Sequence, residues 1–438
     1  MLLPNNRPSG GDFAVVGSGI AGMSAAWLLS QRHRVTLYDR EPRIGGHSHT
    51  VDVAGVPVDT GFIVYNEPNY PNLSALFRHL GVATSASDMG FSVSLDNGAL
   101  EYEGSLMGLV AQPSALLRRD YWRMLSDTLR FYREAPQAEG GVTLGDYLRA
   151  NHYSDAFAKL HLLPMGAAIW SSSIADMMGH PLAAFARFFE NHGLLKLTGR
   201  PQWRTVTGGS IEYVRKLTAP YADRARLGVG IKAILRTGEC VTIVDEAGHR
   251  ASFDGVVIAT PADQALKLLA QPTAEERALL DAVRYRPNTV VLHGDPALMP
   301  KRRGAWTSWN YLGRGDAAAD DDLCVTYWMN KLQPLATREN LFVTLNPPTM
   351  PRAETVHGVY ACAHPVFDAD ALAAQERLWH LQGARRTWFC GSYFGAGFHE
   401  DALQAGLAAA EDAGGVRRPW NVANESGRIV RAPRLVAA

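Results

Sequence analysis

A glycine-rich segment near the N-terminus constrains the fold of this chain more than any other feature. Apolar residues from Phe13 to Val16 run directly into three glycines spaced G-x-G-x-x-G, and a helix-length apolar pattern follows without a break. In such a strand, turn and helix, Gly17 permits the tight turn, Gly19 lets the backbone approach a pyrophosphate, and Gly22 lets the helix lie close to the strand. The helix N-terminus offers backbone N–H groups to the phosphates. The segment therefore predicts a dinucleotide site made of Gly17, Ser18, Gly19, Ile20, Ala21 and Gly22.

A carboxylate stands where the next strand ends. Residues Arg34 to Asp39 are typical of a short strand, and Asp39 follows Gly19 by 20 residues. A carboxylate at this distance holds the ribose hydroxyls of a dinucleotide. Glycine spacing alone arises by chance in a chain with 41 glycines, so the strand, the helix and the acid carry the prediction. The alternative is a glycine-rich loop followed by a surface aspartate.

The loop after Asp39 resembles a known family. Residues 40–47 are basic and contain glycines in an R-x-G-G arrangement. This resembles the superfamily of flavin-containing amine oxidases and phytoene desaturases, in which the acid and the R-x-G-G segment both contact FAD. His47 departs from the pattern, because many relatives have arginine there. The resemblance implies FAD rather than NAD, with contacts from Asp39, Arg40, Arg43, Gly45, Gly46 and His47.

Later segments resemble the same superfamily in the same order. A strand at 226–236, a hairpin and the strand 254–262 match the part of the superfamily in which Ile231 lies near the adenine and Thr260 lies in a turn beneath the cofactor. Near the C-terminus a strand stops at Gly391, and a second glycine turn precedes a helix predicted over 403–410. A helix N-terminus of this kind binds anions. The resemblance implies flavin contacts from Gly391, Gly397, Phe398 and His399, although Gly391-Ser392 replaces the usual glycine-acid pair.

These motifs predict an α/β fold: a discontinuous, Rossmann-like FAD-binding domain with an inserted α+β substrate domain, as in amine oxidases. With 438 residues, the chain is long enough for two or three domain-sized units. We assign residues 11–68, 201–275 and 385–415 to the FAD-binding domain. Residues 69–200 and 276–384 form the substrate domain, and 1–10 and 416–438 are tails.

Composition excludes several classes of protein. The 43 basic and 43 acidic residues give zero net charge, so a nucleic-acid-binding surface is not expected. Apolar runs stay below the length of about 18 residues that a transmembrane helix needs, and residues 1–10 lack the apolar core of a signal peptide. We predict a cytoplasmic protein, peripheral to the inner membrane face if it contacts a membrane. The four cysteines are far apart, which predicts free thiols and no metal site.

Three strings resemble one branch of the superfamily more closely. They are P-M-G-A-A-I-W at 164–170, G-G-S at 208–210 and G-F-H-E-D at 397–401. The branch contains predicted FAD-dependent oxidoreductases associated with cyclopropane-fatty-acid synthases. It implies hydride removal from a lipid acyl chain, with a membrane or a lipid methyltransferase as partner. Two alternatives stay open: an amine oxidase acting on a small amine or polyamine, and a flavin-bound, non-catalytic partner of a methyltransferase.

The chemistry is predicted to occur in an apolar cavity bordered by Phe398. With one nucleotide-binding glycine motif, electrons are expected to come from the substrate as hydride. Candidates at the cavity edge are His399, His364 and Tyr311, and His364 is the predicted base because histidine titrates near neutral pH. The alternative for each histidine is an ordinary hydrogen bond in the core. We expect FAD to be held non-covalently, although Cys362, His364, His47 and His49 lie near its expected ring.

Overall fold

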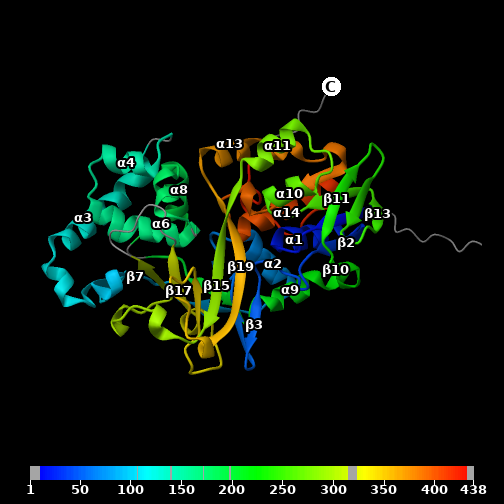
Figure 1. Cartoon of the computed structure of the whole chain (residues 1–438). Helices are drawn as coiled ribbons and strands as arrows, with labels where there is room; N and C mark the ends of the chain where they lie inside the picture. The colour runs from blue at the N-terminus through cyan, green and yellow to red at the C-terminus, as the bar shows by residue number, and fades with distance from the viewer. Residues whose placement is uncertain are drawn as a thin grey trace, which may run out of the picture.

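The computed structural model describes residues 10–105, 107–138, 141–170, 172–196, 199–313 and 323–431. The chain forms two lobes, each built on a large sheet of its own (Figure 1). The lobe at the right of Figure 1 contains both chain ends of the described residues and is called the nucleotide lobe; the other is the substrate lobe. The predicted tail 1–10, apart from its last residue, and residues 432–438 lie outside the described ranges.

The nucleotide lobe contains a five-stranded parallel sheet whose strands come from three distant parts of the chain. Val15 and Val257 on neighbouring central strands are fully buried, as expected for parallel strands covered on both faces. The predicted α/β class with a discontinuous, Rossmann-like domain is confirmed. In sheet order the strands are β10 (Ala225–Leu227), β2 (Arg34–Asp39), β1 (Asp12–Val16), β14 (Gly255–Ile258) and β20 (Thr387–Phe389).

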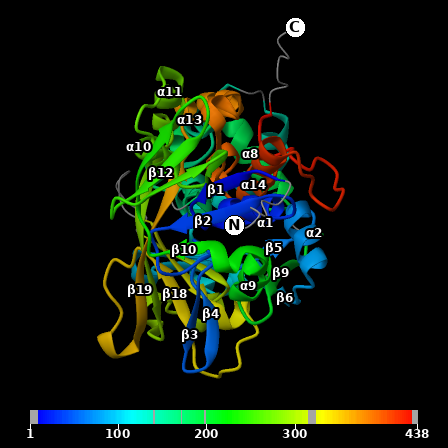
Figure 2. The ribbon, with the colours of Figure 1, turned by 90° about the vertical axis from the view of Figure 1, so that its right-hand side faces the viewer.

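Two helices from opposite ends of the chain pack together beside this sheet. They are α1 (Ile20–Leu29), in which every residue is buried, and α14 (His399–Gly414). A Cβ atom on Gly406 would lie 2.2 Å from the carbonyl oxygen of Ala21, so only glycine permits this approach. The N-terminal and C-terminal motifs are thus neighbours in space (Figure 2).

Smaller sheets complete the nucleotide lobe. A hairpin is formed by β3 (Thr50–Val53) and β4 (Val56–Asp59), and it projects from the lobe in Figure 2. The carboxylate of Asp59 is buried and accepts the backbone N–H of Ser210 at 2.9 Å and the amide of Gln333 at 2.9 Å. It therefore ties the hairpin to both lobes. The remaining strands are β11 (Ile231–Arg236), β12 (Val241–Asp245) and β13 (Arg250–Phe253) in one sheet, and β5 (Tyr65–Asn66), β9 (Trp203–Val206) and β6 (Thr84–Ser87) in another.

The substrate lobe is a seven-stranded sheet covered by helices. In sheet order its strands are β19 (Val356–Val366), β15 (Arg284–His293), β18 (Phe342–Leu345), β17 (Cys324–Trp328), β16 (Trp309–Gly313), β7 (Phe91–Leu95) and β8 (Leu100–Glu103). Its helices are α3 (Arg119–Glu134), α4 (Leu144–Ala150), α5 (Asp155–Phe157), α6 (Leu163–Trp170), α7 (Ile174–Gly179), α8 (Leu182–Asn191) and α12 (Met329–Leu332). The long strands β15 and β19 reach toward the nucleotide lobe (Figure 1).

Several segments pack on the nucleotide lobe although the predicted division places them elsewhere. Leu76 of α2 (Pro71–Leu80), Leu280 of α11 (Ala274–Asp281) and Leu378 of α13 (Ala369–Leu378) are fully buried in its core. In the predicted tail, Trp420 stacks on Trp27 with ring centroids 5.8 Å apart. An apolar helix face shows in the sequence, but the core that receives it does not. Helices α9 (Ile211–Thr218) and α10 (Ala262–Leu268) complete this lobe.

Among the described residues, no helix has the length and apolar character needed to cross a bilayer.

Candidate active site

The first glycine turn leaves room for an anion at the start of α1. Gly17 has φ +103°, and a Cβ atom there would lie 2.8 Å from the oxygen of Ala259. A Cβ on Gly22 would lie 1.9 Å from the oxygen of Gly17, whereas a Cβ on Gly19 would meet no atom within 4 Å. Helix α1 begins without a side-chain cap and without an acidic residue in its first turn. Open space and an uncapped helix N-terminus therefore coincide at Gly19, which fits a pyrophosphate.

The R-x-G-G loop closes over this turn. The N–H of Gly45 donates to the oxygen of Ser18 at 3.1 Å. Gly46 has φ +56°, and a Cβ there would lie 2.8 Å from the Cα of Gly19. Arg43 donates from Nη1 to the oxygen of Gly46 at 2.8 Å, which fixes the loop. The structure thus brings these predicted residues together.

Asp39 is placed to bind a ribose. Its Oδ2 accepts the N–H of Ser18 at 2.7 Å, and its Oδ1 accepts the N–H of Glu41 at 2.9 Å. Each carboxylate oxygen has a further lone pair for a hydroxyl. The N–H of Val229 donates to the oxygen of Asp39 at 2.9 Å, which brings the start of β11, at Ile231, to this point.

Of two further predicted contact residues, Thr260 lies against the glycine turn and Arg40 is exposed. The backbone N of Thr260 would lie 3.2 Å from a Cβ on Gly17, so the turn after β14 lies directly against the glycine turn. Arg40 is exposed and reaches Gln264 Oε1 at 3.4 Å.

The second predicted anion site, at the start of α14, has two carboxylates of the chain in its first turn. Helix α14 starts at His399, four residues before the predicted start at Leu403, and Asp401 accepts the N–H of Phe398 at 2.8 Å. Asp401 also pairs with Arg428 at 3.2 Å. Glu400 is buried and accepts the N–H groups of residues 72 and 73, both at 3.0 Å, at the start of α2. Glu400 therefore caps α2, and Asp401 fixes the turn that leads into α14.

Gly391 and Gly397 shape the approach to α14. Gly391 has extended backbone, whereas Gly397 has φ +93° and donates its N–H to the oxygen of Ser392 at 3.2 Å. A Cβ on Gly397 would lie 2.8 Å from the ring of Phe367, just beyond β19. This contact places Phe398 beside the end of the strand that carries His364.

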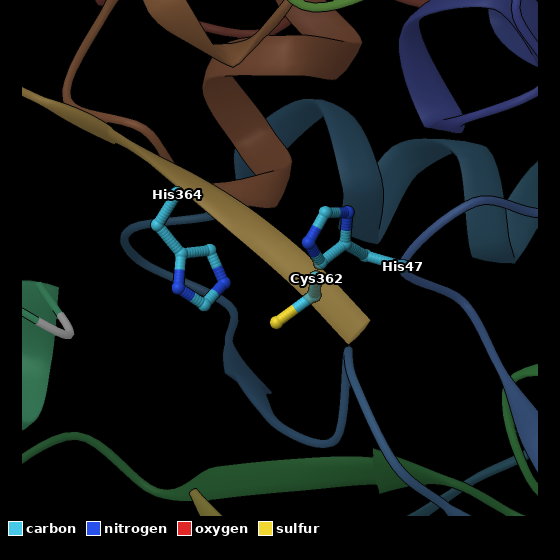
Figure 3. A group of neighbouring side chains, drawn as sticks. All are labelled: His47, Cys362 and His364. Carbon is cyan, nitrogen blue, oxygen red and sulfur yellow. The ribbon is translucent and has the colours of Figure 1, made fainter. Parts of the chain in front are cut away.

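Imidazoles from both lobes meet between them. Cys362 and His364 project from β19 toward His47, which follows the R-x-G-G glycines (Figure 3). The ring centroids of His47 and His364 are 5.4 Å apart. His399 stacks on Phe62 at 3.8 Å. The Nε2 of His399 lies 2.8 Å from the hydroxyl of Tyr213, which also contacts Ser48. Residues distant in sequence thus surround one space.

These imidazoles are held neutral. Desolvation, together with a smaller effect of His47, lowers the pKa of His364 and of His399 to about 3. Desolvation also lowers the pKa of His47, although its side chain is exposed.

A chain of amides fixes the tautomer of His364. The backbone N–H of Thr289 donates to Asn346 Oδ1 at 2.8 Å, so the nitrogen of that amide faces Asn288 and donates to its Oδ1 at 2.8 Å. The Nδ2 of Asn288 then donates to the oxygen of Arg286 at 3.1 Å and faces His364 Nδ1 at 3.3 Å. Because an amide nitrogen only donates, Nδ1 accepts and the proton of the neutral ring sits on Nε2.

The wall around Phe398 is aromatic. Its ring stacks on Phe188 of α8 at 4.7 Å and contacts Trp170 at 6.3 Å and His192 at 6.1 Å between centroids. His192 donates from Nδ1 to the oxygen of Phe188 at 2.9 Å, and burial lowers the pKa of its imidazole to about 4. The sequence motifs did not identify Phe188, His192 or Asn288 as site residues, because no local spacing relates them to Phe398 or His364.

Tyr311 lies on β16, and its side chain is buried in the core of the substrate lobe, in the same apolar cluster as Trp170 and Phe188. Four strand spacings separate β16 from β19, which is about 19 Å along the sheet. The place of Tyr311 at the cavity edge stays a prediction.

The group in Figure 3 also offers metal-ligand atoms. One ligand atom from each of His47, Cys362 and His364 lies within 4.8 Å of the others. Because side chains alternate along β19, Cys362 and His364 lie on one face of the strand. Spacing between cysteines alone does not show this pair. Burial raises the pKa of the Cys362 thiol to about 11, so the thiol is protonated at neutral pH when no metal is bound.

Known proteins resemble this chain in sequence. Residues 20–296 match the family described as flavin containing amine oxidoreductase. The "Putative flavin-containing monoamine oxidase AofH" of Mycobacterium tuberculosis is 28% identical over 278 residues, which are 58% of either chain. The match thus spans little more than half the length of this curated relative.

Solved structures extend the likeness of the fold over nearly the whole chain. A putative protoporphyrinogen oxidase from Exiguobacterium has a TM-score of 0.68 at 15% identity, covering 93% of this chain and 99% of its own. A CLA-producing fatty acid isomerase from P. acnes has a TM-score of 0.62 at 16% identity, covering 94% of this chain and 98% of its own.

Proposed function

The chain belongs to the flavin-containing amine oxidoreductase family, which agrees with the predicted cofactor FAD, and on this basis we propose that it is an FAD-dependent oxidoreductase that removes a hydride from a lipid acyl chain. FAD, when bound, supplies a two-electron acceptor for that hydride. The open space at Gly19, the uncapped start of α1 and the free lone pairs of Asp39 fit its pyrophosphate and ribose. His47, His364 and His399 border the space that its ring would reach.

The observation that carries the substrate proposal is the wall around Phe398. Its aromatic neighbours, Trp170, Phe188 and His192, are uncharged, and each is buried. Such a wall holds an acyl chain by excluding water from it, at about 25 cal/mol per Å² of apolar surface. It offers no charge to a carboxylate or a phosphate. The reacting carbon is then positioned by packing.

We assign His364 the role of a hydrogen-bond donor rather than the base. With Nδ1 accepting from Asn288, the proton stays on Nε2, and burial keeps the ring neutral. A neutral Nε2–H orients an acceptor atom of the substrate or cofactor at the cavity edge. The second proton released with the hydride then goes to another acceptor. Electrons leave to oxygen, a quinone or another carrier, or return with the hydride to the same substrate, which would make the protein an isomerase.

Amine oxidation is the second candidate, and one observation favours it. The Nε2 atoms of His180 and His192 are buried and have no hydrogen-bond partner. Both rings lie near Trp170 or Phe398, so an amine N–H bound within the aromatic wall would satisfy such an acceptor. An acyl chain leaves both atoms unpaired.

The test is anaerobic mixing of the FAD-loaded protein with phospholipids and, separately, with amines. Phospholipids with unsaturated, methylated or cyclopropane acyl chains should bleach the oxidised flavin. Phe398→Ala should slow bleaching strongly, and Tyr311→Phe, which removes the hydroxyl and keeps the ring, tests whether that hydroxyl takes part. Bleaching by amines alone would overturn the lipid proposal. A flavin that no substrate bleaches would favour a non-catalytic partner of a lipid methyltransferase, and co-purification with such an enzyme would then be examined.

A further inference from the structure

The end of the substrate lobe farthest from the nucleotide lobe exposes apolar side chains. Met107 is 79% exposed, Leu117 87%, Trp122 55% and Val110 43%. These four residues, here called the apolar tip, lie in the turns before α3 and in its first helical turns, at the left edge of Figure 1. Large apolar side chains gathered at one extremity of a protein mark a surface that binds something.

The apolar tip is held in place by the chain beneath it. The hydroxyl of Tyr121 donates to the oxygen of Leu109 at 2.8 Å, and Trp122 donates from Nε1 to the oxygen of Leu116 at 2.8 Å. Ala115 and Tyr121 are buried directly below. The apolar side chains therefore project from a fixed base, and their exposure belongs to the fold.

Basic residues flank the apolar tip. Arg118, Arg119 and Arg123 are exposed at the start of α3. A second basic run packs beside them, because a Cβ on Gly304 would lie 3.8 Å from the Cβ of Ala111. In that run Arg302 is engaged by Glu101 at 3.0 Å, whereas Lys301 and Arg303 are exposed.

The acids nearby do not balance these cations. Exposed Asp120 pairs with Arg123 at 3.8 Å, and Glu103 accepts the N–H of Ser105 at 2.9 Å. Among the residues that the structure describes at this end, five exposed cations thus outnumber the exposed aspartates, Asp96 and Asp120, in a chain whose net charge is zero. The local excess of positive charge is a property of this end of the molecule.

We propose that the apolar tip docks on the surface of a bilayer that contains anionic phospholipid. Apolar side chains enter the boundary between headgroups and acyl chains, an indole ring is favoured at that depth, and arginine and lysine pair with the phosphates. The combination of apolar centre and basic border matches this occupant. The inference goes beyond the proposed function and holds whatever the substrate.

The experiment is flotation of the FAD-loaded protein with vesicles of phosphatidylcholine alone and of phosphatidylcholine mixed with phosphatidylglycerol. Binding to the anionic vesicles should exceed binding to neutral ones by at least about tenfold and should weaken with salt. Leu117→Asp combined with Trp122→Ala should abolish binding, and Arg118→Glu with Arg119→Glu should remove the preference for anionic vesicles.

Val359→Asp is the matched control, because Val359 is 52% exposed on β19, outside the apolar tip. It should bind like the parent protein. Retained FAD and an unchanged melting temperature show that each variant is folded. Failure of the parent protein to bind anionic vesicles, equal binding to neutral ones, or an equal loss in the control would overturn the proposal.

Discussion

The two lobes contribute to the candidate site by different physical means. In the nucleotide lobe, position depends on the backbone: Gly17, Gly22 and Gly406 stand where a Cβ atom would collide with a carbonyl oxygen. In the substrate lobe, position depends on pairs of side chains, such as Phe188 with Phe398. A backbone requirement shows in the sequence as a residue type at a fixed spacing. A side-chain pair leaves no such mark.

The sharpest test of this contrast lies within the first glycine turn, and it has the largest expected effect. Gly22→Ala places a Cβ where the oxygen of Gly17 lies 1.9 Å away, so stability should fall by about 3 kcal/mol or more. Gly19→Ala meets no atom within 4 Å and should change stability by less than about 0.5 kcal/mol. It should nevertheless lower FAD affinity, because the methyl group fills the space left for the pyrophosphate.

Urea unfolding and FAD titration measure the two effects separately. Equal destabilisation by both substitutions would show that Gly19 serves the fold and not the cofactor. Unchanged FAD affinity in Gly19→Ala would show that the pyrophosphate does not bind at this turn.

The buried imidazoles, which lie mostly in the substrate lobe and at its border, should make stability depend on pH. Desolvation lowers the pKa of eight of the fourteen histidines from 6.5: His47, His49, His161, His180, His192, His293, His364 and His399. Below pH 6.5 the unfolded chain binds protons that the folded chain binds only at lower pH, near pH 4 or 3 for the seven histidines other than His47. Stability therefore falls as pH drops, by up to about 1.4 kcal/mol per pH unit for each titrating histidine.

Three buried carboxyls act in the opposite direction. Burial raises the pKa of Asp59 to about 6, and it raises those of Glu400 and Asp401. Their folded forms hold protons that the unfolded chain has released, so their contribution falls as pH rises toward 6. Urea unfolding between pH 7 and 5 decides between the two trends, and His180→Phe should reduce the slope. A stability that rises as the solution is acidified would contradict the expectation.

The ribose contact allows a smaller test in the nucleotide lobe. Asp39→Ala should weaken FAD binding by about 1–3 kcal/mol, the cost of a lost charge-assisted hydrogen bond. The carboxylate also accepts the N–H of Ser18, so part of the loss passes through the glycine turn. Asp39→Asn, which keeps an acceptor, is the matched control in a calorimetric titration with FAD. Equal affinity for all three proteins would show that the carboxylate does not contact the ribose.

The sequence predicted most of what the backbone determines. The glycine turn, Asp39, the R-x-G-G loop and the α/β class of the nucleotide lobe follow from local patterns with fixed geometry. The early start of α14 was not predicted, because its residue Glu400 accepts hydrogen bonds at the start of α2, more than 300 residues away in the sequence. The distance of Tyr311 from β19 was not predicted for a related reason: strand order in the substrate sheet sets it, and no spacing in the sequence reports that order.

The amide chain behind His364 offers the smallest and most specific test of the substrate lobe. In Asn288→Asp, one carboxylate oxygen still accepts from Asn346, but the other no longer donates to His364 Nδ1. The proton of the ring should therefore move to Nδ1, which turns Nε2 into an acceptor, and the neighbouring negative charge should raise the pKa of His364. Loss of the bond to the oxygen of Arg286 should cost about 1 kcal/mol.

Nitrogen chemical shifts of the imidazole in labelled protein distinguish the two tautomers directly. Asn288→Leu is the control, because it removes the amide without supplying an acceptor and should leave the ring without a fixed tautomer. If Nε2 carries the proton in the parent and Nδ1 carries it in Asn288→Asp, the side chain of Asn288 sets the tautomer of His364. A ring already protonated on Nδ1 in the parent would return His364 to the role of base, because its Nε2 would then be free to accept the substrate's proton.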